Sequence, residues 1–276
     1  METKVMGVLR LAPHAFADNG RSRTRAVVTR GRRMISEGAD IVEIACTPPT
    51  VELPQVEQVT NVVGALSGNA RVALATGSPT LAAAATAAGA TLISDYSMLP
   101  GAANGTSREE LVGVAAEAGA GWVAVHTAAP VPSADGESGA GRAVTRALES
   151  LEAQAEGASA AGLSEIYLDP GIGCGRSHEE DLDLLGGLQR LAGLGRPLVV
   201  GTGDGSLIDE LHAAADTRRL PVPGTPGERN ADRLEGALVV AVWAMLAGAA
   251  VLRTQHVAAT VQAARTVGAR RPLGTP

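Results

Sequence analysis

The sequence contains few aromatic residues and few cysteines. Aromatic residues make up 2% of the chain and Phe16 is the sole phenylalanine, so a flat ring ligand would find few side chains on which to stack. The two cysteines, Cys46 and Cys174, are too few for a disulfide scaffold, and no CxxC pair or histidine cluster provides zinc spacing. These absences predict a protein of a reducing compartment without a structural zinc site.

The chain also lacks a net positive charge and long apolar runs. A net charge of −6 and a pI near 5.4 provide no basic field for a phosphate backbone, so no nucleic-acid partner is expected. No apolar run approaches the roughly 18 residues that cross a bilayer, and the first residues, METKVMG, lack the basic and apolar regions of a signal peptide. We therefore expect no membrane partner and a cytoplasmic location.

What the chain does contain is a repeated helix-to-strand pattern. Several times an Ala/Leu-rich segment ends at a glycine, and a short β-branched apolar run follows at once. Glycine just past a helix end adopts the left-handed conformation without strain, and the apolar run suits a strand buried on both faces. These handover glycines are Gly38, Gly89, Gly119, Gly162, Gly195 and Gly248. With the runs at 5–11 and 71–76, the pattern predicts eight parallel strands.

Eight strands separated by helical segments predict a single (β/α)8 TIM barrel, with one domain over residues 1–276. The alternative is a doubly wound open sheet. That fold would normally show a glycine-rich phosphate turn after its first strand, where this chain has RLAPHAF. In a barrel, the residues that act follow the carboxyl ends of the strands.

Four segments of the chain resemble dihydropteroate synthase in order and spacing. They are the MGVL run from Met6 with its following Pro13, Phe16 and Asp18, then EGADIVEI, YLDPGIGCGRSHEEDLDLL and RLEGALVVAVWAMLAGAAVLRTQHV. The resemblance implies a barrel enzyme that joins p-aminobenzoate to a pterin carrying a pyrophosphate leaving group, with magnesium at the anion. It also implies a homodimer formed through the last helices, and the segment 234–264 is strongly apolar.

Several positions depart from the residues that the resemblance implies. Arg10 stands where the family has a metal-holding asparagine, and Ala75 replaces a pterin-binding aspartate. Ser94 replaces an asparagine, although Asp95 remains, and Gly205 replaces the lysine that holds the pterin. These changes fall on the polar contacts to pterin and argue against ordinary dihydropteroate synthesis.

Other functional positions are kept or exchanged. Asp169 of LDPG is intact, and Arg253 near the end of the chain is retained. Arg176 replaces a lysine after the LDPGIG turn, and Gln255 replaces the closing histidine. Magnesium remains possible. No metal ligand is assigned, because Arg10 replaces the asparagine that usually holds the metal.

These residues suggest a site for a small-molecule substrate. We expect Arg10 and Arg253 to approach each other and clamp an anion, although Arg10 could instead pair with Asp18. Asp169 is the candidate acid or base, the alternative being that it only caps its own turn. His14 and His256 are further acid–base candidates, or are simply solvated. The remaining expected substrate contacts are Ser94, Asp95, Arg176 and Gln255.

Three functions stay open at this stage. The first is an enzyme repurposed for a non-pterin, anionic small molecule. The second is a catalytically silent homologue that acts as a binding or partner subunit. The third is a genuine dihydropteroate synthase, a transferase that forms a C–N bond, with a rebuilt site.

Overall fold

A computed structural model describes residues 3–11, 21–46, 53–98, 107–127, 141–202, 208 and 228–268. Eight strands lie in these ranges, one in each segment that the glycine pattern predicted. They are β1 (Lys4–Arg10), β2 (Ile41–Ala45), β3 (Arg71–Thr76), β4 (Leu92–Asp95), β5 (Gly121–Val125), β6 (Ile166–Asp169), β7 (Val199–Gly201) and β8 (Val251–Thr254). All six handover glycines have positive φ, as their position past a helix end requires.

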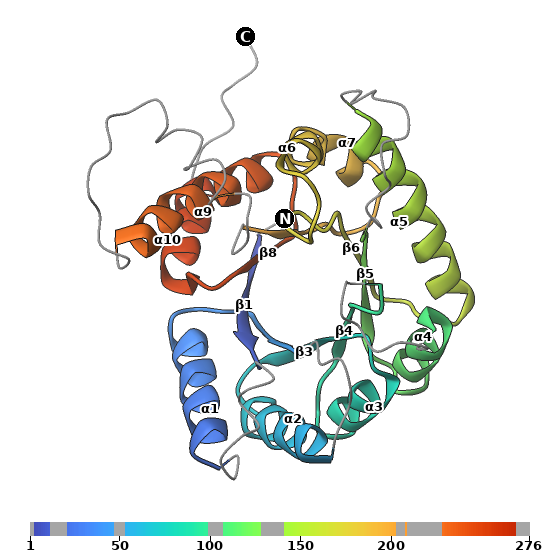
Figure 1. Ribbon diagram of the computed structural model, residues 1–276, viewed down its shortest axis with the longest axis vertical. Coiled ribbons are helices and arrows are strands. Elements are labelled where there is room, and N and C mark those ends of the chain that lie inside the picture. Colours follow the sequence, from blue (N-terminus) through green and yellow to red (C-terminus); the bar gives the residue numbers. More distant parts are fainter. Residues whose placement is uncertain are drawn as a thin grey trace.

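The strands form one parallel sheet in the order β6-β5-β4-β3-β2-β1-β8-β7. The sheet closes between β6 and β7, where Leu168 and Leu198 form a parallel bridge and the Leu168 N–H donates to the Pro197 carbonyl at 3.0 Å. Figure 1 shows the resulting ring of strands viewed along its axis. The (β/α)8 barrel is therefore confirmed, and the open doubly wound alternative is excluded.

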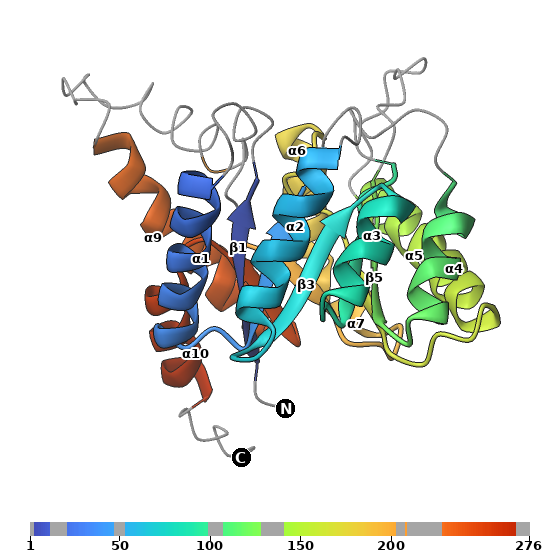
Figure 2. The same ribbon diagram turned by 90° about the horizontal axis from the view of Figure 1, so that it is seen from below.

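Helices surround the ring and cover its outer face (Figure 1). They are α1 (Arg21–Ser36), α2 (Leu53–Leu66), α3 (Pro79–Ala87), α4 (Arg108–Glu117), α5 (Arg142–Ala160), α6 (His178–Gly186), α7 (Leu188–Ala192), α9 (Glu228–Leu246) and α10 (Val257–Gly268). Figure 2 shows the barrel from the side, with β1 and β3 running in the same direction. In the described part of the chain, no helix is long and apolar enough to cross a membrane.

The barrel interior changes from apolar to polar along the even-numbered strands. Each of the four even-numbered strands contributes one apolar residue to the inside of the ring: Ile41, Leu92, Tyr167 and Val251. Two residues further along the same strands lies the set that we call the polar layer: Glu43, Ser94, Asp169 and Arg253, all buried. TIM barrels build each interior layer from alternate strands in this way. The polar layer therefore lies on the side of the carboxyl ends, where barrel enzymes act.

A second ion pair lies at the opposite, amino-terminal end of the barrel. Arg71 forms a two-bond fork with Glu165, with Nη1–Oε1 and Nη2–Oε2 distances of 2.7 Å each. The Tyr167 hydroxyl also donates to Glu165 at 2.7 Å. The side chains of Arg71 and Glu165 are 24% and 44% exposed. An ion pair this exposed contributes little to stability. It consists of the same two residue types, arginine and glutamate, as Arg253 and Glu43 of the polar layer.

The acidic net charge conceals one basic helix. Helix α1 carries six arginines and no acidic residue. Among those whose side chains are described, Arg25, Arg30, Arg32 and Arg33 are exposed, and Arg33 pairs with Glu37 at 2.7 Å. The sequence does contain one arginine-rich segment, although the charge of the whole chain remains acidic.

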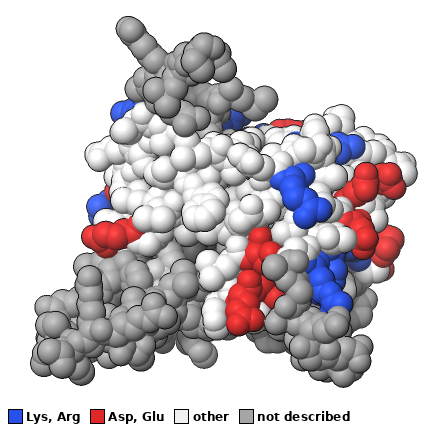
Figure 3. Space-filling view, turned by 90° about the horizontal axis from the view of Figure 1, so that it is seen from above, with Lys and Arg blue, Asp and Glu red and all other residues white. Residues whose placement is uncertain are grey.

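One side of the molecule exposes apolar residues of α9. Val239, Trp243 and Leu246 are 63%, 50% and 46% exposed, and we call these three residues the apolar face. They help to line a groove of about 660 Å³ between α9 and the α6–α7 segment. Figure 3, which views the molecule from the top of Figure 1, shows a broad area without charged residues on this side. Apolar areas of this kind on a soluble domain mark contact surfaces.

Candidate active site

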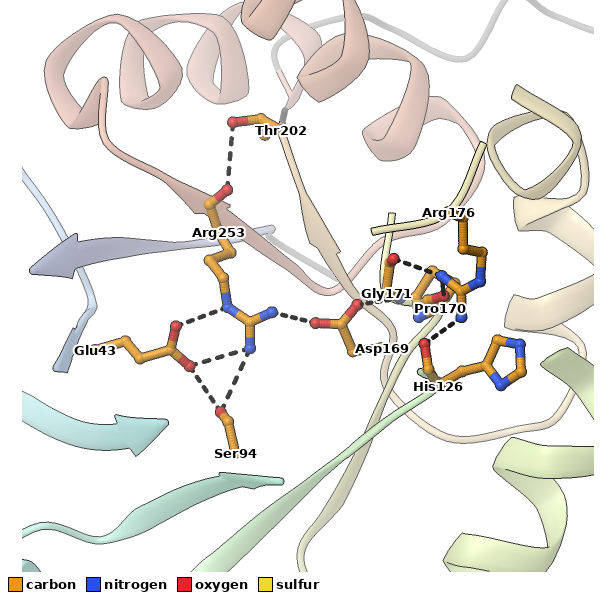
Figure 4. Close-up of polar contacts among 9 residues, drawn as sticks. All are labelled: Glu43, Ser94, His126, Asp169, Pro170, Gly171, Arg176, Thr202 and Arg253. Atoms are coloured by element: carbon orange, nitrogen blue, oxygen red, sulfur yellow. Dashed lines mark hydrogen bonds and ion pairs between the residues drawn. The ribbon is translucent and has the colours of Figure 1, made fainter. Parts of the chain in front are cut away.

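The polar layer is organised by the guanidinium of Arg253 (Figure 4). Its Nε lies 2.8 Å from Glu43 Oε2, and its Nη2 donates to Glu43 Oε1 at 3.0 Å, so that the two side chains form a fork. Ser94 Oγ donates to Glu43 Oε1 at 2.7 Å. Strands β2, β4 and β8 thus meet through side chains inside the barrel.

The remaining terminal nitrogen of Arg253 reaches β6. Nη1 donates to Asp169 Oδ2, and the guanidinium carbon lies 5.9 Å from the ring centroid of Tyr96. Burial lowers the pKa of Arg253, but the carboxylates of Glu43 and Asp169 outweigh burial and hold this pKa well above its ordinary value. One cation therefore serves two buried carboxylates, and the polar layer carries an excess of one negative charge.

Asp169 combines the two roles that the sequence left open. Its Oδ1 accepts the backbone N–H of Gly171 at 2.7 Å, which is the turn-capping contact. Its Oδ2 meanwhile faces Arg253 in the barrel interior. The capping bond fixes the carboxylate so that one oxygen points into the polar layer.

Arg176 holds this turn from the other side (Figure 4). Its Nη1 donates to the carbonyls of Gly171 at 2.6 Å and Pro170 at 3.3 Å, and its Nη2 donates to the carbonyl of His126. In the structure, the terminal nitrogens of Arg176 contact three backbone carbonyls, and its expected substrate contact stays a prediction. Its contacts join the end of β5 to the Asp169 turn.

The expected Arg10–Arg253 clamp does not form. Met6 is the β1 partner of Arg253, and Arg10 lies four residues beyond Met6, or about 13 Å further along the strand. Arg253 is buried between carboxylates, whereas Arg10 is exposed. Arg10 has no polar partner within the described ranges, and Asp18, its alternative partner, lies outside them.

Asp95 also lies outside the polar layer. Successive residues of a strand point to opposite faces, so Asp95 points away from the interior that its neighbour Ser94 faces. It accepts from Ser97 Oγ at 2.5 Å and from Arg108 Nε at 2.6 Å. Asp95 thus forms an ion pair that joins β4 to α4, and its expected substrate contact stays a prediction.

Comparison with known proteins identifies the family of the chain. Residues 6–255 match the family model described as "Pterin binding enzyme". The chain belongs to the pterin-binding enzyme family. It is 29% identical to the dihydropteroate synthase of Mycobacterium leprae, over 96% of this chain and 93% of the relative. It is 25% identical to that of Staphylococcus haemolyticus, over 96% and 94%.

Solved structures of dihydropteroate synthases share the fold of this pterin-binding family member. The Xanthomonas albilineans protein in complex with 7,8-dihydropteroate is 27% identical, with a TM-score of 0.78 and coverage of 98% of this chain and 95% of that chain. The Thermus thermophilus protein in complex with 6HMPPP is 28% identical, with a TM-score of 0.77 and the same coverage, 98% and 95%. The resemblance read from the sequence is confirmed over nearly the whole chain.

Two site residues of this pterin-binding enzyme were missed in the sequence. Glu43 anchors Arg253, and the signal was available, because Glu43 is the single charge in the buried run IVEIA. His126 follows β5 and is 5% exposed, and its Nδ1 has no hydrogen-bond partner among the residues that the structure describes. Burial, followed by the charges of Arg176, Arg146 and Arg108, lowers the pKa of His126 to about 4.

His126 should make stability depend on pH. The folded protein takes up a proton at this histidine only near pH 4, whereas the unfolded chain does so near 6.5. The free energy of unfolding should therefore fall by roughly 3 kcal/mol as the pH drops from 6.5 to 4. In urea titrations across this range, His126→Gln should remove most of that slope and exposed His178→Gln should leave it. An unchanged slope in His126→Gln would contradict the assignment.

The remaining candidate residues and the two cysteines differ in exposure. Gln255 and His256 are partly exposed, and the His256 N–H donates to Thr254 Oγ1 at 3.0 Å. His14 lies outside the described residues. Burial raises the pKa of Cys46 to about 11 and, with Asp169 adding to burial, that of Cys174 to about 12, so neither thiol is an activated nucleophile at neutral pH.

No magnesium ligand is assigned among the described residues of this site. No group of three or more His, Cys, Asp and Glu side chains is placed to hold a metal among the residues that the structure describes. Arg10 brings a positive charge to the mouth at the position of the implied asparagine ligand, and it would repel a divalent cation. We assign no catalytic step to a metal.

Proposed function

We propose that this chain is a dihydropteroate synthase-type enzyme that binds a pterin pyrophosphate and forms a C–N bond to an arylamine such as p-aminobenzoate. The observation that carries this proposal is the acidic excess of the polar layer. Glu43 and Asp169 are 0% and 1% exposed and share one guanidinium. An anionic group would meet repulsion there, whereas N–H donors would find carboxylate acceptors.

A pterin suits this charge distribution. Its amino-pyrimidinone edge presents adjacent planar N–H donors, the same pattern that a guanidinium presents to a carboxylate. Asp169 is already fixed by the Gly171 N–H with its second oxygen facing the interior. We assign Asp169 as the acceptor for this edge, which favours a pterin over the non-pterin anion that the sequence first suggested.

The anionic end of such a substrate would lie further out, toward the mouth. Arg10 is exposed at the end of β1 and would hold the pyrophosphate. The arylamine nitrogen attacks the methylene carbon of the pterin, the carbon–oxygen bond breaks, and pyrophosphate leaves with the bonding electrons. The amine loses one proton, and His256 and His14 remain the candidate acceptors. Ser94 and Gln255 would contribute positioning only.

The test is turnover by the purified protein. Supplied with the reduced pterin pyrophosphate and p-aminobenzoate, it should release pyrophosphate and dihydropteroate in equal amounts. Pyrophosphate release without a C–N product would contradict synthase activity. Absence of any turnover, with or without added magnesium, would favour a silent binding subunit.

A second candidate is an enzyme that acts on a non-pterin, anionic small molecule. The resemblance implies pterin contacts at positions 75 and 94, and both positions favour this candidate. Buried Ala75 has no polar group to offer a pterin, and Ser94 Oγ already donates to Glu43. Exposed Arg10 would then be the main anion contact. Binding of pyrophosphate without any affinity for pterins would support this candidate over the first.

We also propose that the protein is a cytoplasmic homodimer that associates through the apolar face of α9. Two free cysteines are compatible with a reducing compartment. Wild type should elute with twice the 27.8 kDa chain mass. The double variant Val239→Glu/Trp243→Glu should elute as a monomer, because it buries charge in an apolar contact. Light scattering would check this, with Met98→Glu as the control at an equally exposed apolar residue outside the face.

A further inference from the structure

Glu43 is buried, charged and unassigned by the resemblance to dihydropteroate synthases. We propose that Glu43 is a positioning residue, which keeps Arg253 neutralised while a ligand takes the carboxylate of Asp169. This inference rests on the proposed function for the identity of the ligand. The contacts of Glu43 and Asp169 with the guanidinium of Arg253 do not depend on the proposed function.

The contacts divide unequally between the two carboxylates. Glu43 has two contacts with Arg253: an ion-pair contact between Oε2 and Nε at 2.8 Å, and a hydrogen bond that Oε1 accepts from Nη2 at 3.0 Å. Asp169 accepts only Nη1, through Oδ2, and its other oxygen is occupied by the Gly171 N–H. A donor edge that binds Asp169 Oδ2 competes with Nη1 of Arg253 for this oxygen and can leave the contacts between Arg253 and Glu43 intact.

This division decides what ligand binding costs. Breaking a buried ion pair is costly when it leaves a charge without a partner. After Nη1 leaves Asp169, Arg253 still has Glu43, so no uncompensated cation is created. Without the charge of Glu43, Asp169 would be the sole carboxylate partner of Arg253. A ligand that took the place of Arg253 at Asp169 would then leave the buried arginine without a carboxylate partner.

Glu43 is itself held in place. Ser94 Oγ donates to its Oε1 at 2.7 Å, and its side chain is fully buried. A carboxylate fixed in this way keeps the guanidinium plane in one orientation. The freed Nη1 would then lie next to the bound ligand instead of turning away from it.

The first arm of the test is a calorimetric titration with 6-hydroxymethylpterin pyrophosphate. Glu43→Gln keeps the shape of the side chain and removes its charge, so we expect its dissociation constant to rise at least tenfold. Glu165→Gln is the control, because Glu165 also contacts an arginine, Arg71, through both carboxylate oxygens, but at the opposite end of the barrel. Its dissociation constant should stay within twofold of wild type. An equally small change in Glu43→Gln would overturn the proposal.

The second arm needs no pterin. Arg253→Ala should leave a guanidinium-shaped space between Glu43 and Asp169, so 10 mM methylguanidinium should raise its thermal midpoint by several degrees over the sodium chloride control. The rise should disappear in Arg253→Ala/Glu43→Gln and persist in Arg253→Ala/Glu165→Gln. An equal rise in both double variants would overturn the role of Glu43.

The two arms separate the two failures. If wild type binds no pterin but Arg253→Ala is rescued only when Glu43 is present, the proposed function fails and the anchoring role stands. If Arg253→Ala is not folded when purified, its refolding yield with and without methylguanidinium replaces the thermal midpoint. A yield that does not depend on Glu43 would count against the proposal.

Discussion

Arg253→Ala should lower the free energy of unfolding by about 3–5 kcal/mol, the cost of leaving buried charges without their partner. The substitution removes the single cation of the polar layer and leaves Glu43 and Asp169 facing each other inside the barrel. Both side chains are almost fully buried, so solvent cannot screen their repulsion. Urea unfolding followed by circular dichroism at pH 7.5 would measure the loss.

Arg71→Ala is the matched control for this prediction. It removes the same kind of fork, but the partner Glu165 is 44% exposed and solvent replaces the lost contact. We expect a loss of about 1 kcal/mol or less. Equal losses in the two variants would mean that the Arg253 cluster is not held by buried charge.

Gly171→Ala should destabilise the protein by at least about 3 kcal/mol, by combining left-handed strain with a steric clash. Gly171 has φ of +69°, and a Cβ added there would lie 2.2 Å from the His126 carbonyl oxygen. Both the end of β5 and the turn that fixes Asp169 would have to move. Loss of ligand binding should therefore accompany the loss of stability, measured on the same urea titration and by calorimetry.

Gly173→Ala separates the strain from the clash. Gly173 also has positive φ, +79°, but an added Cβ would meet no atom within 4 Å. It should cost only the backbone term of about 1 kcal/mol. If Gly171→Ala were as mild as Gly173→Ala, the close approach of this turn to β5 would be wrong.

The fold was predictable because the signals that define it are local. A glycine past a helix end and an apolar run after it mark six of the strands, and apolar runs alone mark β1 and β3; all eight strands lie where these signals predicted them. Such pairs depend only on residues adjacent in sequence. The retained LDPG and RLEG segments are local signals of the same kind, and they indicate the family whose model matches residues 6–255.

The candidate site was harder to predict because it depends on which strands face each other. Arg253 and Asp169 could be singled out as candidates, but their ion pair, and the absence of an Arg10–Arg253 clamp, follow from the register of β1 with β8 and the layering of alternate strands. The alternation of side chains could have excluded Asp95 from the interior. The backbone contacts of Arg176 could not have been read from the sequence, because they require the path of the turn after β6.

The most direct test of an acceptor site for pterin in the polar layer is calorimetric titration with 6-hydroxymethylpterin, which lacks pyrophosphate, alongside pyrophosphate alone. We expect the pterin to bind, and Asp169→Asn to weaken it by about 1–3 kcal/mol, or roughly 5- to 150-fold, because one buried acceptor is lost. Pyrophosphate alone should bind weakly and should not respond to this variant. Tight binding of pyrophosphate with no measurable affinity for pterin would contradict an acidic, donor-accepting site and restore the anion-binding alternative.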